Sequence, residues 1–196
     1  MVVTQFAFGS PPSDGQGVIT FYRDHHTAGL IRQLLAGLGG ASFLFFAGAL
    51  QASLHREEGT SSWGSAAALA AAATTAAVAF VQAIVIYALV TRTPSDASVA
   101  EALQNIAAVS GRFLSLPLAV FLASASIVLL RGRSLPVWVA WLGLAGAALN
   151  LVSSLRIAID IGGPLGSLAL VSVAVWILVV SVLLAAGRGA APQAPF

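Results

Sequence analysis

The sequence predicts an all-α fold, a polytopic membrane helix bundle with five transmembrane helices. Hydrophobic residues make up 58% of the 196 positions and charged residues only 8%, and five long apolar segments follow one another along the chain. Soluble domains contain roughly 25% charged residues, so these few charges could not cover a soluble surface. Each apolar segment is close to the ~20 residues that a helix needs to cross the hydrocarbon of a bilayer.

The residues before the first apolar segment, 1–28, are polar and turn-rich. They lack the basic start and the apolar core of ~7–15 residues that mark a cleaved signal peptide. We therefore expect a flexible or interfacial N-terminal arm, followed by a five-helix transmembrane domain over residues 29–188. The spans are expected at about 30–54, 64–90, 105–130, 136–155 and 164–186. Residues 189–196 are expected to form a disordered tail.

The second and third spans need separate justification. Residues 66–79 are so rich in alanine that a soluble helix would fit them equally well, but the strongly apolar continuation 78–90 favours a span. The third segment is irregular, because residues 99–111 are partly polar and Arg112 precedes the apolar stretch 113–130. Either the span begins within this polar half, or an interfacial helix precedes a short span.

The fourth span begins with Pro136 in its first turn, where the missing N–H costs nothing. Five spans place the two termini on opposite sides of the membrane. The arginines divide almost evenly between the two sides, so the positive-inside rule decides little. Because Arg23 and Arg32, near the start of the first span, outnumber Arg56 beyond its end, we favour a cytoplasmic N-terminus in the cytoplasmic (inner) membrane of a bacterium.

Charged residues within or beside spans are costly and are the first candidates for function. Arg112 is the strongest of them, and Asp160 is its expected partner because both should lie on the same membrane side. Arg156 lies four residues before Asp160, and Glu101 and Asn105 precede Arg112 in the third segment. These five residues predict a polar cluster that binds a head group, an ion or a small polar ligand. A network of charges that only fixes how the helices meet would have the same sequence pattern.

Three uncharged polar residues, Gln51, Gln82 and Asn150, lie within predicted spans. We expect them to form hydrogen bonds between helices. A pore between the subunits of a homo-oligomer is the alternative use of these side chains.

Several functions are disfavoured. The chain has no lysine for Schiff-base chemistry and no cysteine for thiolate chemistry. Asp24, His25 and His26 form the only concentration of metal-ligand types, whereas a zinc site needs three or four converging ligands. No basic patch for nucleic acid and no group of nucleophile, base and acid is found. We expect no metal, no cofactor and no nucleic-acid partner, and we lean against an enzyme.

The segment FYRDHH before the first span and the stretch RGRSLPVWVAW, Arg131 to Trp141, resemble parts of small uncharacterised multi-span membrane proteins of high-GC bacteria. No function or residue role comes with this resemblance. The expected function is a non-enzymatic binding or accessory subunit, holding a lipid, another small hydrophobic ligand or a partner membrane protein. A small homo-oligomeric transporter or channel is the first alternative, and a lipid-modifying membrane enzyme is the second. The expected partners are the lipid bilayer and either a partner membrane subunit or further copies of the chain in a homo-oligomer.

Overall fold

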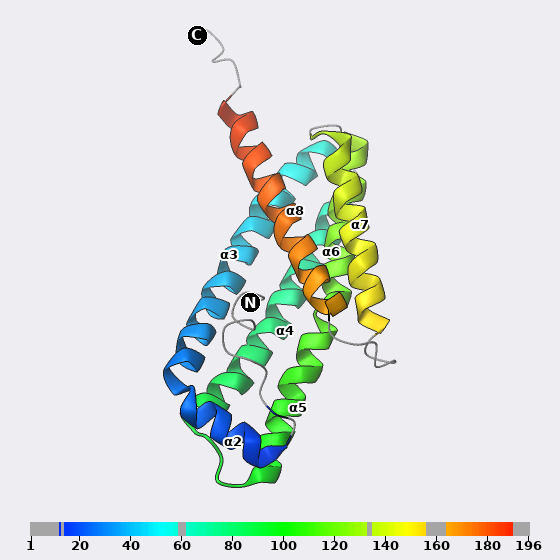
Figure 1. The fold of residues 1–196 in the computed structure, drawn as a ribbon. Coiled ribbons are helices and arrows are strands. Elements are labelled where there is room, and N and C mark those ends of the chain that lie inside the picture. The colour runs from blue at the N-terminus through cyan, green and yellow to red at the C-terminus, as the bar shows by residue number, and fades with distance from the viewer. Residues whose placement is uncertain (1–11, 13, 59–61, 133–134, 156–163, 190–196) are drawn as a thin grey trace.

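The computed structural model describes residues 12, 14–58, 62–132, 135–155 and 164–189, and every element there is an α-helix (Figure 1). The helices are α2 (Gly15–Asp24), α3 (His26–Glu58), α4 (Trp63–Thr91), α5 (Ala97–Phe113), α6 (Ser115–Gly132), α7 (Val137–Ser154) and α8 (Pro164–Gly189). Five helical stretches are long and apolar enough to cross a membrane: α3, α4, α5 with α6, α7 and α8. The predicted all-α bundle with five candidate spans is confirmed.

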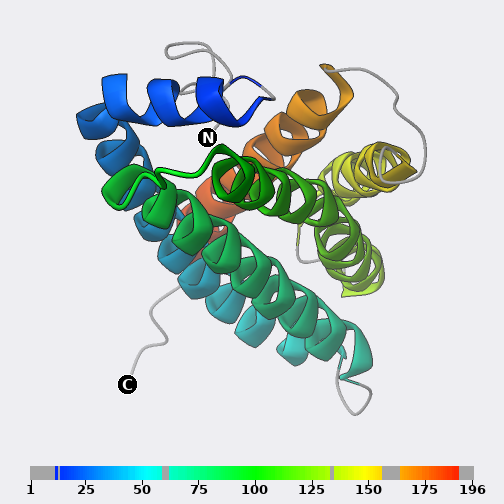
Figure 2. The same ribbon diagram turned by 90° about the horizontal axis from the view of Figure 1, so that it is seen from below.

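Residues 15–24 of the predicted arm form the packed helix α2 rather than a flexible segment. Asp14 caps the helix, because its side chain accepts a 2.7 Å hydrogen bond from the Gly17 amide. Val18, Ile19 and Tyr22 are buried against α4 and α5. Seen from below, α2 lies across the ends of the longer helices (Figure 2). The Asp14 cap therefore stabilises the start of α2, and the apolar face of α2 packs it against α4 and α5.

The third span is a single long helical unit with an interruption at Leu114. Helix α5 begins after Asp96, whose side chain caps the amide of Ser98. Leu114 keeps right-handed helical angles (φ −58°, ψ −28°), so α6 continues from α5. Pro117 has no N–H to donate to the carbonyl of Phe113, which explains why the hydrogen-bond ladder breaks there. The polar half of the segment is thus part of the same helical stretch, which covers Ala97–Gly132.

Antiparallel packing sets the relative heights of the helices. Gly143 of α7 lies against Ser126 of α6, and Gly146 of α7 lies against Leu122. The two helices run in opposite directions. Eight residues after Gly146 in α7 and eight residues before Leu122 in α6 therefore lie at the same height, which places Ser154, the last residue of α7, level with Leu114. Helix α7 therefore covers α6 but not α5, and the end of the bundle that carries α2 is built from α2, α3, α4 and α5 (Figure 1).

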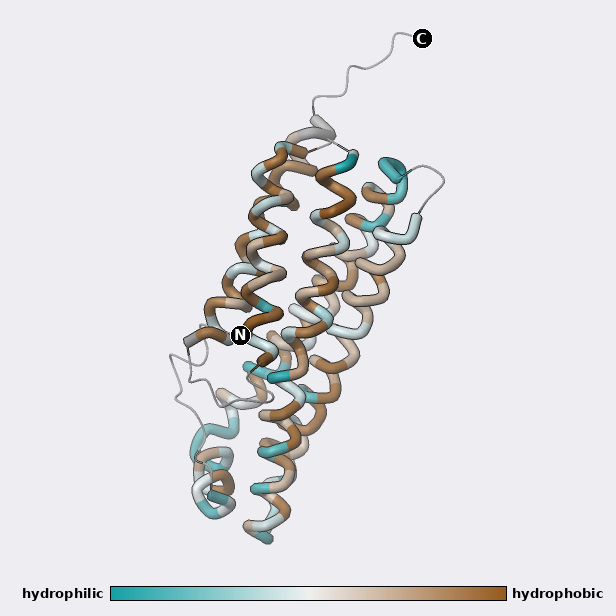
Figure 3. The backbone as a smooth tube through the Cα atoms, turned by 90° about the vertical axis from the view of Figure 1, so that its right-hand side faces the viewer, coloured by the Kyte–Doolittle hydropathy of each residue, from teal (hydrophilic) through white to brown (hydrophobic). Residues whose placement is uncertain are grey.

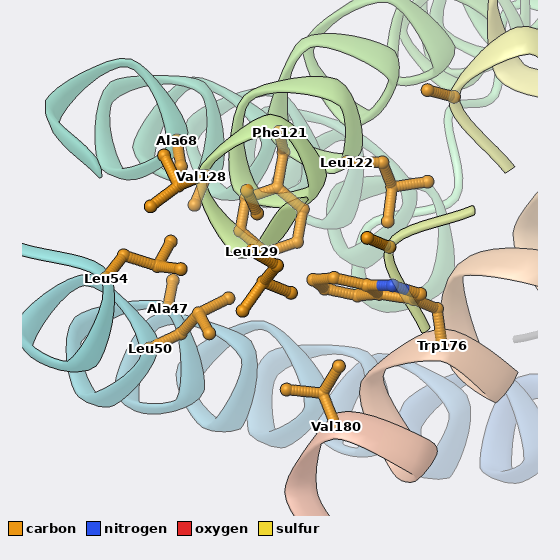
Figure 4. Packing of buried hydrophobic residues seen from close by; sticks show 14 of the residues in the cluster. Ala47, Leu50, Leu54, Ala68, Phe121, Leu122, Val128, Leu129, Trp176 and Val180 are labelled. Atoms are coloured by element: carbon orange, nitrogen blue, oxygen red, sulfur yellow. The ribbon is translucent and has the colours of Figure 1, made fainter. Parts of the chain in front are cut away.

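Two apolar clusters correspond to these two parts of the bundle. The larger one joins α3, α4, α6, α7 and α8 around Phe121 and Trp176, whose ring centroids are 5.9 Å apart (Figure 4). The indole Nε1 of Trp176 donates a 3.0 Å hydrogen bond to the carbonyl of Val139, linking α8 to α7. The smaller cluster joins α2, α4 and α5. Apolar residues dominate the middle of the bundle, and polar residues recur toward its ends (Figure 3).

The end of α3 opposite α2 is held by a carboxylate cap. Glu58 closes α3, and its two carboxylate oxygens each accept a 2.9 Å hydrogen bond, from the amides of Gly64 and Ser65 in the first turn of α4. A negative charge at a helix N-terminus is stabilising, because unpaired N–H groups point toward it. This contact links the end of α3 to the first turn of α4.

Candidate ligand-binding cavity

The predicted polar cluster is only partly within the described residues. Arg156 and Asp160 lie outside them. Glu101, Asn105 and Arg112 are spaced by four and seven residues, so they share one face of α5. All three are exposed. These three residues share an outward-facing surface of α5, but Glu101 and Arg112 are eleven positions apart, about 16 Å along the helix, so the three do not meet at one point.

The three intramembrane amides lie on three different helices. Gln82 of α4 donates a 3.0 Å hydrogen bond from Nε2 to the carbonyl of Ala107 in α5. Asn150 of α7 is fully buried, and its Nδ2 donates to the carbonyls of Gly146 at 2.9 Å and of Ala169 in α8 at 3.3 Å. Gln51 is half-buried on α3. Gln82 and Asn150 thus connect neighbouring helices, as the sequence suggests for residues of this kind.

A cavity of about 300 Å³ lies between α3, α4 and the junction of α5 with α6. Ligand cavities occupy ~300–1,000 Å³, so this one would hold a small ligand or part of a larger one. Part of the lining consists of small residues, which leave the space between the helices unfilled: Gly39, Gly40, Ala76, Ala79 and Ala83. Larger apolar side chains complete the lining: Phe43, Ile86, Leu114, Leu118 and Leu170. Helix α7 contributes no residue to this lining.

The cavity is open on one side. Leu35 of α3 and Phe80 of α4 both line it and are 54% and 38% exposed. In a bilayer, side chains on this outer surface of α3 and α4 would face lipid, since both helices are apolar enough to span it. The mouth of the cavity is thus placed to admit a hydrophobic molecule sideways from the membrane.

Four polar residues contribute to the lining: Arg32 and Gln33 on α3, and Thr75 and Gln82 on α4. Gln33 is only 9% exposed, and within the described residues its side chain makes no hydrogen bond. The Gln82 amide, by contrast, is bonded to Ala107. A buried amide beside a cavity has an unmet capacity for hydrogen bonds, which a ligand could satisfy.

Arg32 lies close to the contact between α2 and α5. The hydroxyl of Tyr22 donates a 3.1 Å hydrogen bond to Oε1 of Gln104. Burial raises the pKa of the Tyr22 phenol above its ordinary value, and the positive charge of Arg32 partly offsets that rise. Arg32, Gln33, Tyr22 and Gln104 therefore form a polar layer near the α2 end of the bundle, and the rest of the cavity is mainly apolar.

Sequence reasoning used Arg32 only to judge orientation and did not single out Gln33. A signal was present, because Arg32 follows directly on the start of the first apolar segment at Leu30, and ionisable residues inside such segments are candidates for function. What the sequence does not show is that α4 and α6 leave a cavity beside it.

The fold and the cavity define a class: a polytopic α-helical membrane protein with a side-opening cavity that is polar at one end. Searches against known protein families, curated proteins and solved structures give no match for this chain.

Proposed function

We propose that the protein is an integral membrane binding protein that holds a small hydrophobic ligand or one lipid chain in the cavity between α3, α4 and α6. The single observation that carries this proposal is the cavity itself, apolar along its walls and open beside Leu35 and Phe80. Binding of this kind requires no chemical step. We place the protein in the cytoplasmic membrane of a bacterium, in line with the resemblance of its sequence.

A ligand fits the concave site better than a protein partner does. A partner helix has a diameter of ~10–12 Å with its side chains, and a 300 Å³ cavity is too small to receive one. An accessory role toward another membrane subunit stays compatible with the proposal, because such a subunit would use the outer helix faces instead.

The alternatives receive less support from the geometry. An oligomeric channel would need Gln51, Gln82 and Asn150 to face a pathway between subunits, yet Asn150 is fully buried within the chain. A lipid-modifying enzyme that clamps head groups with Arg112 and Asp160 would need both side chains at one site. Arg112 is exposed on α5, away from the cavity lining.

Native mass spectrometry of the protein, extracted from its own membrane in mild detergent, tests the proposal. The wild type is expected to carry one retained hydrophobic mass. Ala79→Leu should remove this mass, because the larger side chain fills the cavity. Ala77→Leu is the matched control, because Ala77 lies on the same helix but is exposed and outside the lining.

Both variants must keep the helical content of the wild type, measured by circular dichroism. If folded Ala79→Leu retains the same mass as the wild type, the cavity is not the binding site. If the wild type carries no small mass but a second protein chain, the accessory role replaces ligand binding.

A further inference from the structure

We propose that the ligand is a two-chain anionic phospholipid whose phosphate binds at Arg32 and Gln33, an inference that rests on the binding function proposed above. Four features of the structure support this ligand: the height of Arg32 in the bundle, the length of the cavity, a second hollow beside it and the distribution of charge.

Arg32 lies near the α2 end of the bundle. Gly29 of α3 packs against Val90 of α4, which is one residue from the end of that helix. Arg32 is less than one helical turn beyond Gly29, level with the polar contact between Tyr22 and Gln104. A phospholipid phosphate lies at the polar boundary of the bilayer, where long basic side chains also place their charges.

The cavity extends from this boundary toward the middle of the bundle. Arg32 and Phe43 both line it, and these two positions are eleven residues apart, which corresponds to about 16 Å along α3. Half of a hydrocarbon core ~30 Å thick is ~15 Å. The cavity therefore has the depth of one leaflet, which suits an acyl chain whose head group lies at Arg32.

A second hollow of about 320 Å³ lies beside the first, on the outer surface of α3 and α4. It is lined by Leu30, Leu34, Ile84 and Tyr87, and it shares Gln33, Phe80 and Ala83 with the cavity. The two hollows thus adjoin along these three residues, of which only Gln33 is polar. Two adjoining apolar hollows with a single polar residue on their common boundary match a lipid with two chains better than a single-chain fatty acid.

The charge around Arg32 favours an anion. The carboxylates on the neighbouring elements α2 and α5 and at their N-caps belong to exposed residues, and none of them lines the cavity: Asp14, Asp24, Asp96 and Glu101. Arg32 is half-buried and is the only charged residue among the described residues that line it. A phosphate accepts charge-assisted hydrogen bonds from a guanidinium, and the Gln33 amide would add a neutral donor.

Binding of defined lipids to the delipidated full-length protein in detergent tests the inference. The probes are phosphatidylglycerol and phosphatidylcholine with identical chains, and oleate. Both phospholipids present a phosphate, but the choline cation of phosphatidylcholine is repelled by the positive charge of Arg32, so the wild type is expected to bind phosphatidylglycerol about tenfold more tightly. Arg32→Gln should bind the two phospholipids equally, and Arg32→Lys should keep a preference because it keeps the charge.

Arg56→Gln is the matched control, since Arg56 is an exposed arginine at the opposite end of α3. It should keep the preference of the wild type. If folded Arg32→Gln also keeps it while Ala79→Leu loses binding, the head-group assignment fails and the binding function stands. If Ala79→Leu binds all probes as the wild type does, the binding function itself fails. Tighter binding of oleate than of either phospholipid overturns the two-chain assignment.

Discussion

The hydroxyl of Tyr22 on α2 donates a 3.1 Å hydrogen bond to Oε1 of Gln104 on α5. Eighty-two residues separate the two in sequence. The bond joins a helix that precedes the first span to the polar half of the third. It also closes the polar layer that contains Arg32, so it connects the docking of α2 with the polar end of the cavity.

Tyr22→Phe should loosen α2 without unfolding the bundle. The variant keeps the buried ring, which is 4% exposed, but leaves the Gln104 acceptor without its partner. The expected cost is about 0.5–1.5 kcal/mol of local stability. Hydrogen exchange of the α2 amides should become faster, while that of α6 should be unchanged. Equal exchange of α2 in the variant and the wild type would show that the hydrogen bond does not hold the helix.

High pH should loosen the same helix. Burial raises the pKa of Tyr22 above 10.0, its ordinary value, although Arg32 partly offsets the rise. An acid whose pKa is raised on folding contributes stability that is complete below the unfolded pKa and is lost as pH rises through the folded pKa. The α2 contact is therefore expected to stay intact to about pH 10 and to weaken above it.

Tyrosinate absorbance during an alkaline titration measures this effect, because the chain contains only two tyrosines, Tyr22 and Tyr87. The Tyr22→Phe variant should lose an ionisation step that lies above pH 10.0, the ordinary pKa of a tyrosine. Loss of a step at or below that pH instead would contradict the assignment.

Replacing glycine by alanine should lower the stability of the bundle at Gly143 but not at Gly37. A Cβ on Gly143 would collide with the Ser126 hydroxyl and would lie 2.5 Å from Nε1 of Trp176, so Gly143→Ala should cost about 1–3 kcal/mol. A Cβ on Gly37 would meet no atom within 4 Å. Gly37→Ala should thus be neutral or stabilising by up to about 1 kcal/mol, because alanine favours a helix.

Thermal unfolding in detergent compares these two variants. A melting temperature of Gly143→Ala equal to that of Gly37→Ala would show that α7 does not approach α6 and α8 as closely as the structure has it.

Arg112→Ala should leave both the fold and ligand retention unchanged. Its side chain is exposed on α5 and does not line the cavity. Native mass spectrometry and circular dichroism should give wild-type results, in contrast to the loss expected for Ala79→Leu. Loss of the retained mass in folded Arg112→Ala would restore the polar cluster that the sequence predicts as the binding site.

The polar half of the third segment shows where sequence reasoning reached its limit. Both descriptions of residues 99–111, as part of the span or as a separate interfacial helix, agree with the hydropathy of that stretch. The structure makes it part of one helical stretch, Ala97–Gly132, with a break that Pro117 explains. Hydropathy could not decide between a continuous span and a separate interfacial helix, because it measures composition. The continuity of a helix depends on individual backbone hydrogen bonds.

The sequence by itself determined the class of protein, the five spans and the residues whose polarity is unusual within them, because span length and apolar character are local properties of the chain. Only the tertiary structure showed that Arg32 and Gln33 lie at a cavity while Arg112 faces outward. That difference depends on where α7 ends relative to α5 and α6, and on which faces of α3 and α4 meet. The relative height of two helices and the faces that they turn toward each other arise from packing between residues distant in sequence, such as Gly143 against Ser126 and Trp176.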